Sequence, residues 1–261
     1  MRYLVVAAFL MICQQTNAVD WLDSEVIGKL FADAGVQGTF VLYDVDAKHL
    51  IGHDRVRAET RFVPGSTFKI ANSLLGLSLG AVKGVDEVLP YGGQPQPFKV
   101  WEHDMGLREA IKVSNVPIYQ ELARRIGLKR MRAGVIELDY GNGEIGDVVD
   151  QFWLRGPLKI SAVEQTTFLA RLVQDALPFP KDVQEQVRDI MLLEQGDDWR
   201  LYGKTGWVNA ANPGIGWWVG WVLKRGHVYS FALNIDIGQQ DALLKRIELG
   251  KTSLKALGVL D

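Results

Sequence analysis

Cysteine is almost absent from this chain of 261 residues, whose single example is Cys13. A lone cysteine cannot close an internal disulfide or form a redox-active thiol pair. We predict a secretory signal over 1–18, because Arg2 precedes an apolar run that ends in residues suited to cleavage. A lipoprotein signal ending at Cys13 is disfavoured, since bulky Ile12 precedes it. Removal of the signal takes Cys13 away, and the exported chain must be stabilised by its core.

Excess positive charge is also missing. The chain has 29 basic and 31 acidic residues and no basic run, so we expect no nucleic acid partner. The one long apolar run lies in the predicted signal and is too short to span a bilayer, so we expect no membrane anchor after signal removal. The four histidines are scattered without ligand spacing, which predicts neither a metal site nor a Ser-His-Asp triad: His49, His53, His103 and His227.

Periodicity divides the chain into strands at both ends and helices between them. This pattern predicts an α+β fold: an antiparallel sheet built from both chain ends with flanking helices, plus a helical insertion lobe. We assign 19–261 to one domain, with an α/β lobe over about 19–65 and 198–261 and a helical lobe over about 66–197. Strands are predicted over 38–45, 48–53, 199–203, 215–223 and 227–235. Helices are predicted over 21–34, 67–80, 107–113, 118–126, 129–138, 161–174, 182–193 and 242–257, with 54–61 as a connection.

The most informative stretch surrounds Ser66. Pro64 and Gly65 indicate a turn, and the helix predicted after it carries Lys69 on the face of the serine, one turn away. A serine hydroxyl needs a base to become a nucleophile, and a neighbouring amine can be that base. The alternative is an N-cap serine beside a solvated lysine. A second pattern, Gly76-Leu77-Ser78-Leu79-Gly80, resembles a nucleophile elbow, but it follows a helix where the elbow requires a strand.

Further polar clusters follow Ser66 in a fixed order. With the stretch at Ser66 they make five motifs: Ser66-Thr67-Phe68-Lys69, Ser114-Asn115-Val116, Tyr140-Gly141-Asn142, Gln151-Phe152-Trp153-Leu154 and Lys204-Thr205-Gly206. On these motifs the chain resembles the penicillin-recognising serine enzymes, and specifically the class D (oxacillinase-type) β-lactamases. Trp101 and Asp104, ahead of Ser114, also fit this family. Gly65 and Gly106 depart from the usual pattern without removing a reacting group.

The resemblance implies a role for each motif. Ser66 would be acylated, with the oxyanion held by the N–H groups of Ser66 and Trp207. Ser114 would pass a proton to the leaving nitrogen. The substrate would be bound by Trp101, Val116, Leu154, Lys204, Thr205, Gly206 and Arg246, with Arg246 gripping its carboxylate and Lys245 as the weaker choice for that contact.

The resemblance also implies that Lys69 is modified. Apolar neighbours would lower the pKa of its amine, and the neutral amine would add carbon dioxide (from bicarbonate) to become N6-carboxylysine. Its carboxylate would be the general base, oriented by the indole N–H of Trp153. No other cofactor and no metal is expected.

The resulting expectation is a periplasmic enzyme that hydrolyses penicillin-type β-lactam rings. The alternatives are a penicillin-binding transpeptidase or carboxypeptidase, and a β-lactam sensor domain. The sequence predicts neither the substrate range nor the oligomeric state.

Overall fold

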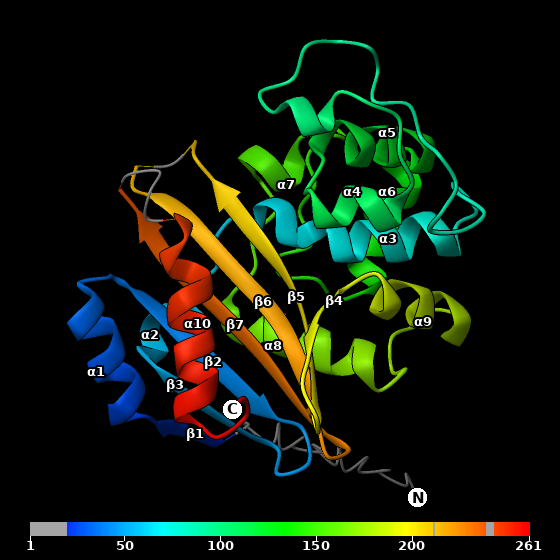
Figure 1. The fold of residues 1–261 in the computed structure, drawn as a ribbon. Coiled ribbons are helices and arrows are strands. Elements are labelled where there is room, and N and C mark those ends of the chain that lie inside the picture. Colours follow the sequence, from blue (N-terminus) through cyan, green and yellow to red (C-terminus); the bar gives the residue numbers. More distant parts are fainter. Residues whose placement is uncertain (1–19, 211, 239–242) are drawn as a thin grey trace, which may run out of the picture.

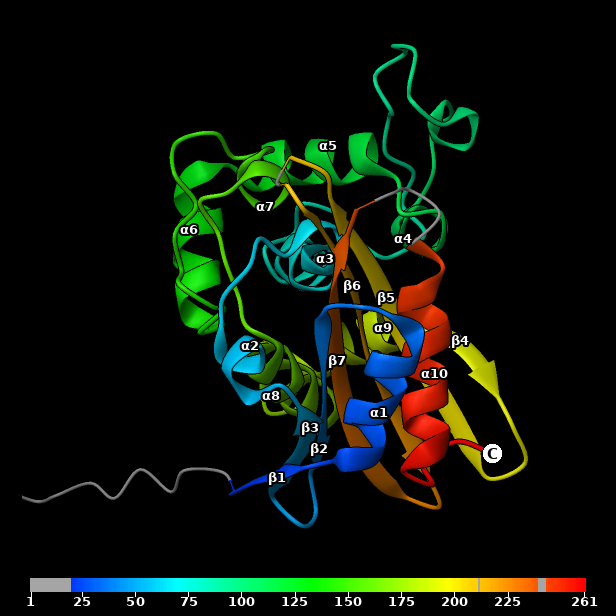
Figure 2. The ribbon, with the colours of Figure 1, turned by 90° about the vertical axis from the view of Figure 1, so that its left-hand side faces the viewer.

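A seven-stranded sheet runs through the molecule, with helices on both faces (Figures 1 and 2). The computed structural model describes residues 20–210, 212–238 and 243–261, so the predicted signal lies outside the described residues. The strand order is β1-β3-β2-β7-β6-β5-β4, which places strands from both chain ends side by side as predicted. Their bounds are β1 Asp20–Asp23, β2 Gly38–Asp44, β3 His49–His53, β4 Leu192–Gln195, β5 Trp199–Val208, β6 Gly214–Lys224 and β7 His227–Ile237.

The helices form two groups. Helices α1 and α10 cover one face of the sheet, while α8 packs on the other face beside the remaining helices (Figure 2). A 3₁₀ turn, η1, spans Gly65–Phe68 and leads directly into α3. The α-helices are α1 Glu25–Ala34, α2 Arg55–Glu59, α3 Lys69–Ser78, α4 Leu107–Lys112, α5 Val116–Ile126, α6 Leu128–Glu137, α7 Phe152–Arg155, α8 Ala162–Val173, α9 Lys181–Asp189 and α10 Lys245–Ala256.

Local signals in the sequence account for several boundaries. Ser161 and Glu164 form the predicted capping box at the start of α8, each side chain accepting the other's backbone N–H. The β6–β7 hairpin turns at Arg225 and Gly226, whose φ values of 51° and 86° suit a tight turn between twisted strands. Gly35, in the left-handed conformation, ends α1.

Three predicted elements were wrong in part. The helix expected from Trp21 begins only at Glu25, because residues 20–23 extend as β1 and pair in parallel with β3. The connection predicted over 54–61 contains α2, a helix of five residues that is too short to show apolar periodicity. The helix expected over 182–193 ends at Asp189, and residues 192–195 form the edge strand β4.

Two apolar cores lie on opposite faces of the sheet. The smaller one contains side chains of α1 and α10 against the sheet, including Phe31, Trp218 and Leu249. The larger one joins the sheet to the helices of the 66–197 stretch and contains Phe68 and Trp153. The larger core therefore surrounds the start of α3, where Ser66 and Lys69 lie.

Candidate active site

Ser66 and Lys69 lie in contact where η1 leads into α3. The Lys69 amine donates a hydrogen bond of 2.7 Å to the Ser66 hydroxyl. Lys69 is completely buried, and this burial, with a smaller contribution from the positive charge of Lys204, lowers the pKa of its amine well below the usual value. The alternative of a solvated lysine is therefore wrong. A lowered pKa favours the neutral amine, whose lone pair is what proton abstraction from Ser66 requires.

An aromatic cluster is centred on Phe68, the residue before the lysine. Phe68 stacks on Trp153 with ring centroids 5.6 Å apart, and it meets Tyr140 and Phe152 edge-on. Trp153 is completely buried, and its indole N–H has no hydrogen-bond partner among the described residues. An unpaired buried donor is costly, so this N–H is available to an acceptor that joins the site. Val116 at the start of α5 is half-buried, as is Leu154 in α7.

Ser114 and Lys204 form the second polar pair. The Lys204 amine donates hydrogen bonds of 2.9 Å to the Ser114 hydroxyl and to the Thr205 carbonyl. Ser114 has φ of 56°, an unusual conformation for a residue with a side chain, and Asn115 then caps α5 by accepting the Ile118 N–H. Burial, followed by the positive charge of Arg246, lowers the pKa of Lys204 to about 7. Lys204 thus joins β5 to the connection between α4 and α5.

Strand β5 lies directly against η1. A Cβ atom on Gly206 would lie 2.9 Å from the Pro64 carbonyl oxygen, and one on Gly65 would lie 3.0 Å from the Trp207 carbonyl oxygen. Gly65 also has φ of 55°, so a side chain there would have both an unfavourable backbone conformation and a close contact with Trp207. These contacts bring the backbones of Ser66 and Trp207, the two predicted oxyanion donors, close together. They also explain why a glycine precedes the serine in this chain.

Arg246 reaches the same strand from α10. Its guanidinium Nη1 donates a hydrogen bond of 2.8 Å to the Gly206 carbonyl, and its Nε is buried with no partner among the described residues. Partial burial lowers the pKa of Arg246 to about 10. Lys245, the weaker sequence candidate, is exposed, and its amine lies 3.5 Å from the Ala34 carbonyl. Arg246 is therefore the basic residue that joins Lys204, Thr205 and Gly206.

Trp101 borders the site from the loop that precedes α4. Its indole N–H donates to the Val113 carbonyl at 2.9 Å, one residue before Ser114, and its ring meets Phe98 edge-on at 4.8 Å. Asp104 accepts the backbone N–H of Tyr91 instead of pointing to a reacting group. Trp101 thus forms an apolar rim beside Ser114, whereas Asp104 holds the loop.

One neighbour of Lys69 was not predicted from the sequence. Tyr119 on α5 is completely buried, and the centroid of its ring lies 5.3 Å from the Lys69 amine. From the sequence alone it would be assigned to the core as an ordinary buried aromatic residue. The available signal was its position, five residues after Ser114 on a helix that starts at the site.

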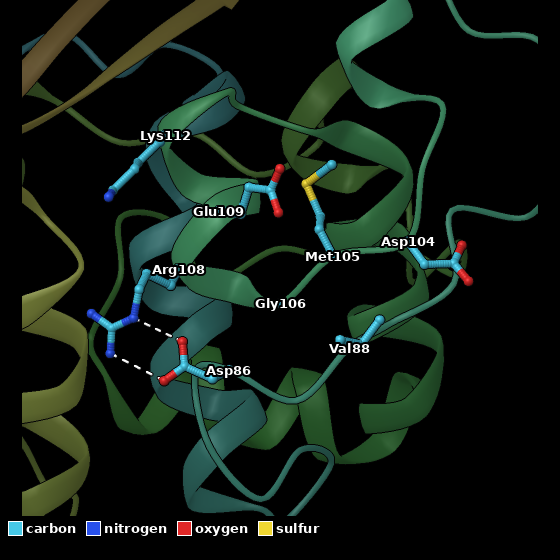
Figure 3. Close-up of a pocket in the computed structure, with 8 residues that line it drawn as sticks. All are labelled: Asp86, Val88, Asp104, Met105, Gly106, Arg108, Glu109 and Lys112. Atoms are coloured by element: carbon cyan, nitrogen blue, oxygen red, sulfur yellow. Dashed lines mark hydrogen bonds and ion pairs between the residues drawn. The ribbon is translucent and has the colours of Figure 1, made fainter.

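Two surface cavities lie near these residues. One, of about 390 Å³, is lined mainly by charged side chains beside α4, and its Arg108 is already paired with Asp86 (Figure 3). Its lining contains no serine, threonine or cysteine. The other, of about 330 Å³, has Lys204 and Thr205 in its lining and therefore opens beside the predicted substrate-binding strand.

Within residues 20–210, 212–238 and 243–261, no cluster of three or more His, Cys, Asp or Glu side chains could hold a metal ion. No helix in the same ranges is both long and apolar enough to span a bilayer.

The chain matches known proteins over nearly all its length. Residues 38–254 match the penicillin-binding protein transpeptidase domain family. β-Lactamase OXA-48 of Klebsiella pneumoniae is 38% identical over 98% of both chains, and β-lactamase OXA-10 of Pseudomonas aeruginosa is 38% identical over 89% of this chain and 88% of that protein. The solved structure of FUS-1 (OXA-85), a class D β-lactamase from Fusobacterium nucleatum subsp. polymorphum, superposes with a TM-score of 0.89 at 45% identity, covering 92% of this chain and 100% of that one.

Proposed function

The chain belongs to the class D β-lactamases, hydrolases that act on β-lactams, and on this basis we propose that it opens penicillin-type rings through an acyl-enzyme on Ser66. The observation that carries the proposal is the buried Lys69 amine, 2.7 Å from the Ser66 hydroxyl. A serine attacks a lactam carbonyl only when a base removes its proton, and Lys69 is the group in contact with it.

The acylation step uses four further groups, namely two backbone N–H groups and the side chains of Ser114 and Lys204. Ser66 Oγ forms a bond to the lactam carbonyl carbon while its proton passes to the Lys69 side chain. The N–H groups of Ser66 and Trp207 stabilise the oxyanion. The C–N bond then breaks, and the nitrogen takes a proton from Ser114. Lys204 supplies a new proton to Ser114 through their 2.9 Å hydrogen bond. Before deacylation, Lys69 releases the proton it took and Lys204 regains one, both by exchange with solvent. A water molecule then forms a bond to the ester carbonyl carbon as its proton passes to the Lys69 side chain, the C–O bond to Ser66 breaks, and Ser66 Oγ takes that proton back.

We further propose that Lys69 carries an N-carboxylate formed from carbon dioxide. The amine must be neutral to react, and burial favours the neutral form. The unpartnered indole N–H of Trp153 fits a new acceptor in this pocket. When bound, the group supplies a carboxylate that accepts protons in both acylation and deacylation. Trp153 would hold its oxygen and exclude water with the Phe68 ring.

The substrate would be held along β5. Lys204, Thr205 and Arg246 present positive charge and a hydroxyl to the carboxylate that penicillins carry. Trp101, Val116 and Leu154 would contact the apolar parts of the ligand. Secretion to the periplasm, through removal of 1–18, remains part of this proposal.

A penicillin-binding transpeptidase or carboxypeptidase and a β-lactam sensor are the alternatives, since both form the acyl-enzyme. Steady-state turnover of nitrocefin tests the proposal. We expect many turnovers per enzyme molecule, and a single stoichiometric burst would favour the alternatives. Kinetic constants across penicillins, oxacillin, cephalosporins and imipenem would then define the substrate range.

A further inference from the structure

The side chain of Tyr119 faces the reactive end of Lys69. Its ring centroid lies 5.3 Å from the Lys69 amine, within the range of a cation–π contact, and both side chains are completely buried. The proposed function assigns no task to this tyrosine. Its burial alone would be satisfied by any aromatic or aliphatic residue, so its contacts decide whether it does more.

Two consecutive residues of α3 fix the position of Tyr119. The side-chain amide of Asn72 donates to the Tyr119 carbonyl at 3.1 Å, and the Ser73 hydroxyl lies 2.9 Å from the Tyr119 hydroxyl. Ser73 also donates to the Lys69 carbonyl at 2.8 Å. A serine hydroxyl has one proton, so the Tyr119 hydroxyl is the donor in its contact with Ser73. The ring is therefore tied at its backbone and at its tip to the helix turn that begins with Lys69.

The face of an aromatic ring carries partial negative charge, which attracts an ammonium ion more strongly than a neutral amine. The ring of Tyr119 thus acts on Lys69 in the opposite direction to burial, which favours the neutral amine. Burial is the larger effect, because the pKa of Lys69 is lowered overall. A cation–π contact with the ring would limit how far this pKa is lowered.

We propose that Tyr119 is a positioning residue that holds the Lys69 amine toward Ser66 and stabilises its protonated form, and so sets the pH at which the amine becomes available to carbon dioxide. The availability to carbon dioxide rests on the proposed function, whereas the effect on the protonated amine does not.

The other groups around Lys69 act differently. Lys204 on β5 repels the protonated amine, and Arg246 on α10 acts on Lys204 in the same sense. Tyr140 packs on Phe68, and burial raises the pKa of its phenol, so it stays neutral. Among the described residues no carboxylate forms a hydrogen bond or ion pair with Lys69. The Ser66 hydroxyl, which accepts the hydrogen bond of the Lys69 amine, and the ring of Tyr119 are therefore the described groups that favour the charged lysine by direct contact.

The test measures the protonation of Lys69 without turnover. The chain is labelled with ε-¹³C lysine, the Lys69 resonance is assigned by its loss in Lys69→Ala, and its pH midpoint is followed in carbon dioxide-free buffer. Fluorinated phenylalanines at position 119 keep the size of the ring and weaken the charge on its face. We expect the pH of the midpoint to fall with fluorination. At full fluorination the proton concentration at the midpoint should be about 2- to 30-fold higher, as the usual strength of a cation–π contact implies.

Two variants provide the controls. Tyr119→Phe keeps the ring face and removes the hydroxyl, and Ser73→Ala removes its partner, so we expect both midpoints to stay within about 2-fold of the unmodified protein. A midpoint that does not respond to fluorination, or that moves as far in Tyr119→Phe as in the fluorinated variants, would overturn the proposal.

A second arm separates this inference from the proposed function. With ¹³C-bicarbonate present, the pH at which the carbamate resonance reaches half its maximum should fall in parallel with the amine midpoint. A ring effect on the amine without any carbamate resonance in the unmodified protein would count against the carboxylated lysine and leave the positioning role supported. A carbamate resonance whose pH dependence is unchanged by fluorination of the ring would overturn the inference that Tyr119 sets the pH at which Lys69 binds carbon dioxide.

Discussion

Lys204 on the sheet donates a hydrogen bond of 2.9 Å to Ser114, 90 residues earlier in the chain. The same amine is almost fully buried, and its pKa is lowered to about 7 by burial and by Arg246. A substrate carboxylate placed beside Lys204 would restore its charge, because an anion favours the protonated form. In the proposed function, the hydrogen bond to Ser114 and the charge toward substrate would therefore be two functions of a single side chain.

Lys204→Ala should lower kcat/KM chiefly for substrates that carry the carboxylate. Loss of a charge-assisted contact costs about 1.5–3 kcal/mol, which is roughly 10- to 150-fold. Matched β-lactams without the carboxylate should lose less. Equal losses for both would show that the effect of Lys204 comes from the fold or the proton relay and that the substrate carboxylate contributes nothing to it.

Ser66→Ala should abolish acylation and leave the fold intact, because Ser66 is small and half-buried at the η1 turn. Intact-mass spectrometry after penicillin treatment should find no adduct, with an unchanged melting temperature as the control. An adduct that still forms would move the nucleophile to Ser114 or Ser78, of which Ser78 has an enclosed hydroxyl.

Activity should fall as the pH is lowered and recover when bicarbonate is added. Below the lowered pKa of Lys69 the amine is protonated and cannot bind carbon dioxide, so acid removes the proposed base.

Trp153→Ala should acylate slowly and stall before deacylation, with only partial rescue by bicarbonate. One carbamate resonance should appear with ¹³C-bicarbonate and be absent in Lys69→Ala. Turnover that ignores bicarbonate, with no such resonance, would favour a free amine as the base.

The free energy of unfolding should rise with pH above about 7. The folded-state pKa of Lys204 is about 7 against an ordinary value of 10.5, so between these values the unfolded chain binds more protons than the folded one. This group alone contributes a slope of at most about 1.4 kcal/mol per pH unit. Urea unfolding of Lys204→Met across this range should show a smaller slope, and identical slopes would contradict the burial argument.

Gly250→Ala should impair substrate binding from a distance. A Cβ at Gly250 would overlap the ring of Trp218, so α10 must move away from β6, and Arg246 on the same helix would lose its contact with Gly206. Overpacking of this kind costs about 1–3 kcal/mol of stability, and we expect a raised KM for penicillins. Gly84→Ala is the matched control, because its nearest neighbour would lie 3.7 Å away. A raised KM in both variants would show that the change in KM does not come from displacement of Arg246.

The sequence predicted the elements with strong local signals. The capping box at Ser161 and the turn before β7 needed only neighbouring residues, and both were confirmed. The edge strands β1 and β4 were missed because both are short and mostly exposed, so they show no alternation of buried side chains. Their partners β3 and β5 define them as strands, which is information from elsewhere in the chain.

The predicted site residues were found by motif, and the sequence also indicated apolar neighbours that lower the pKa of Lys69, but it did not indicate Tyr119. The spacing of Ser66 and Lys69 predicts that they share a helix face, which the 2.7 Å contact reflects. The contact between Lys69 and Tyr119 joins α3 to α5, and nothing local to either residue indicates it. Likewise, the need for glycine at 65 follows from the approach of Trp207 on β5, which lies 142 residues later in the chain.

The pairing of β2 with β7 has a consequence for how the molecule is assembled. The first strands of the sheet occupy residues 20–53, while the strand that joins them to β6 and β5 begins only at His227. Contacts between residues this far apart in sequence close large loops and form slowly. Until β7 docks, β2 has an open edge that another chain could occupy. Catalytic competence should therefore appear abruptly and last, so recovery of activity during refolding reports completion of the entire sheet.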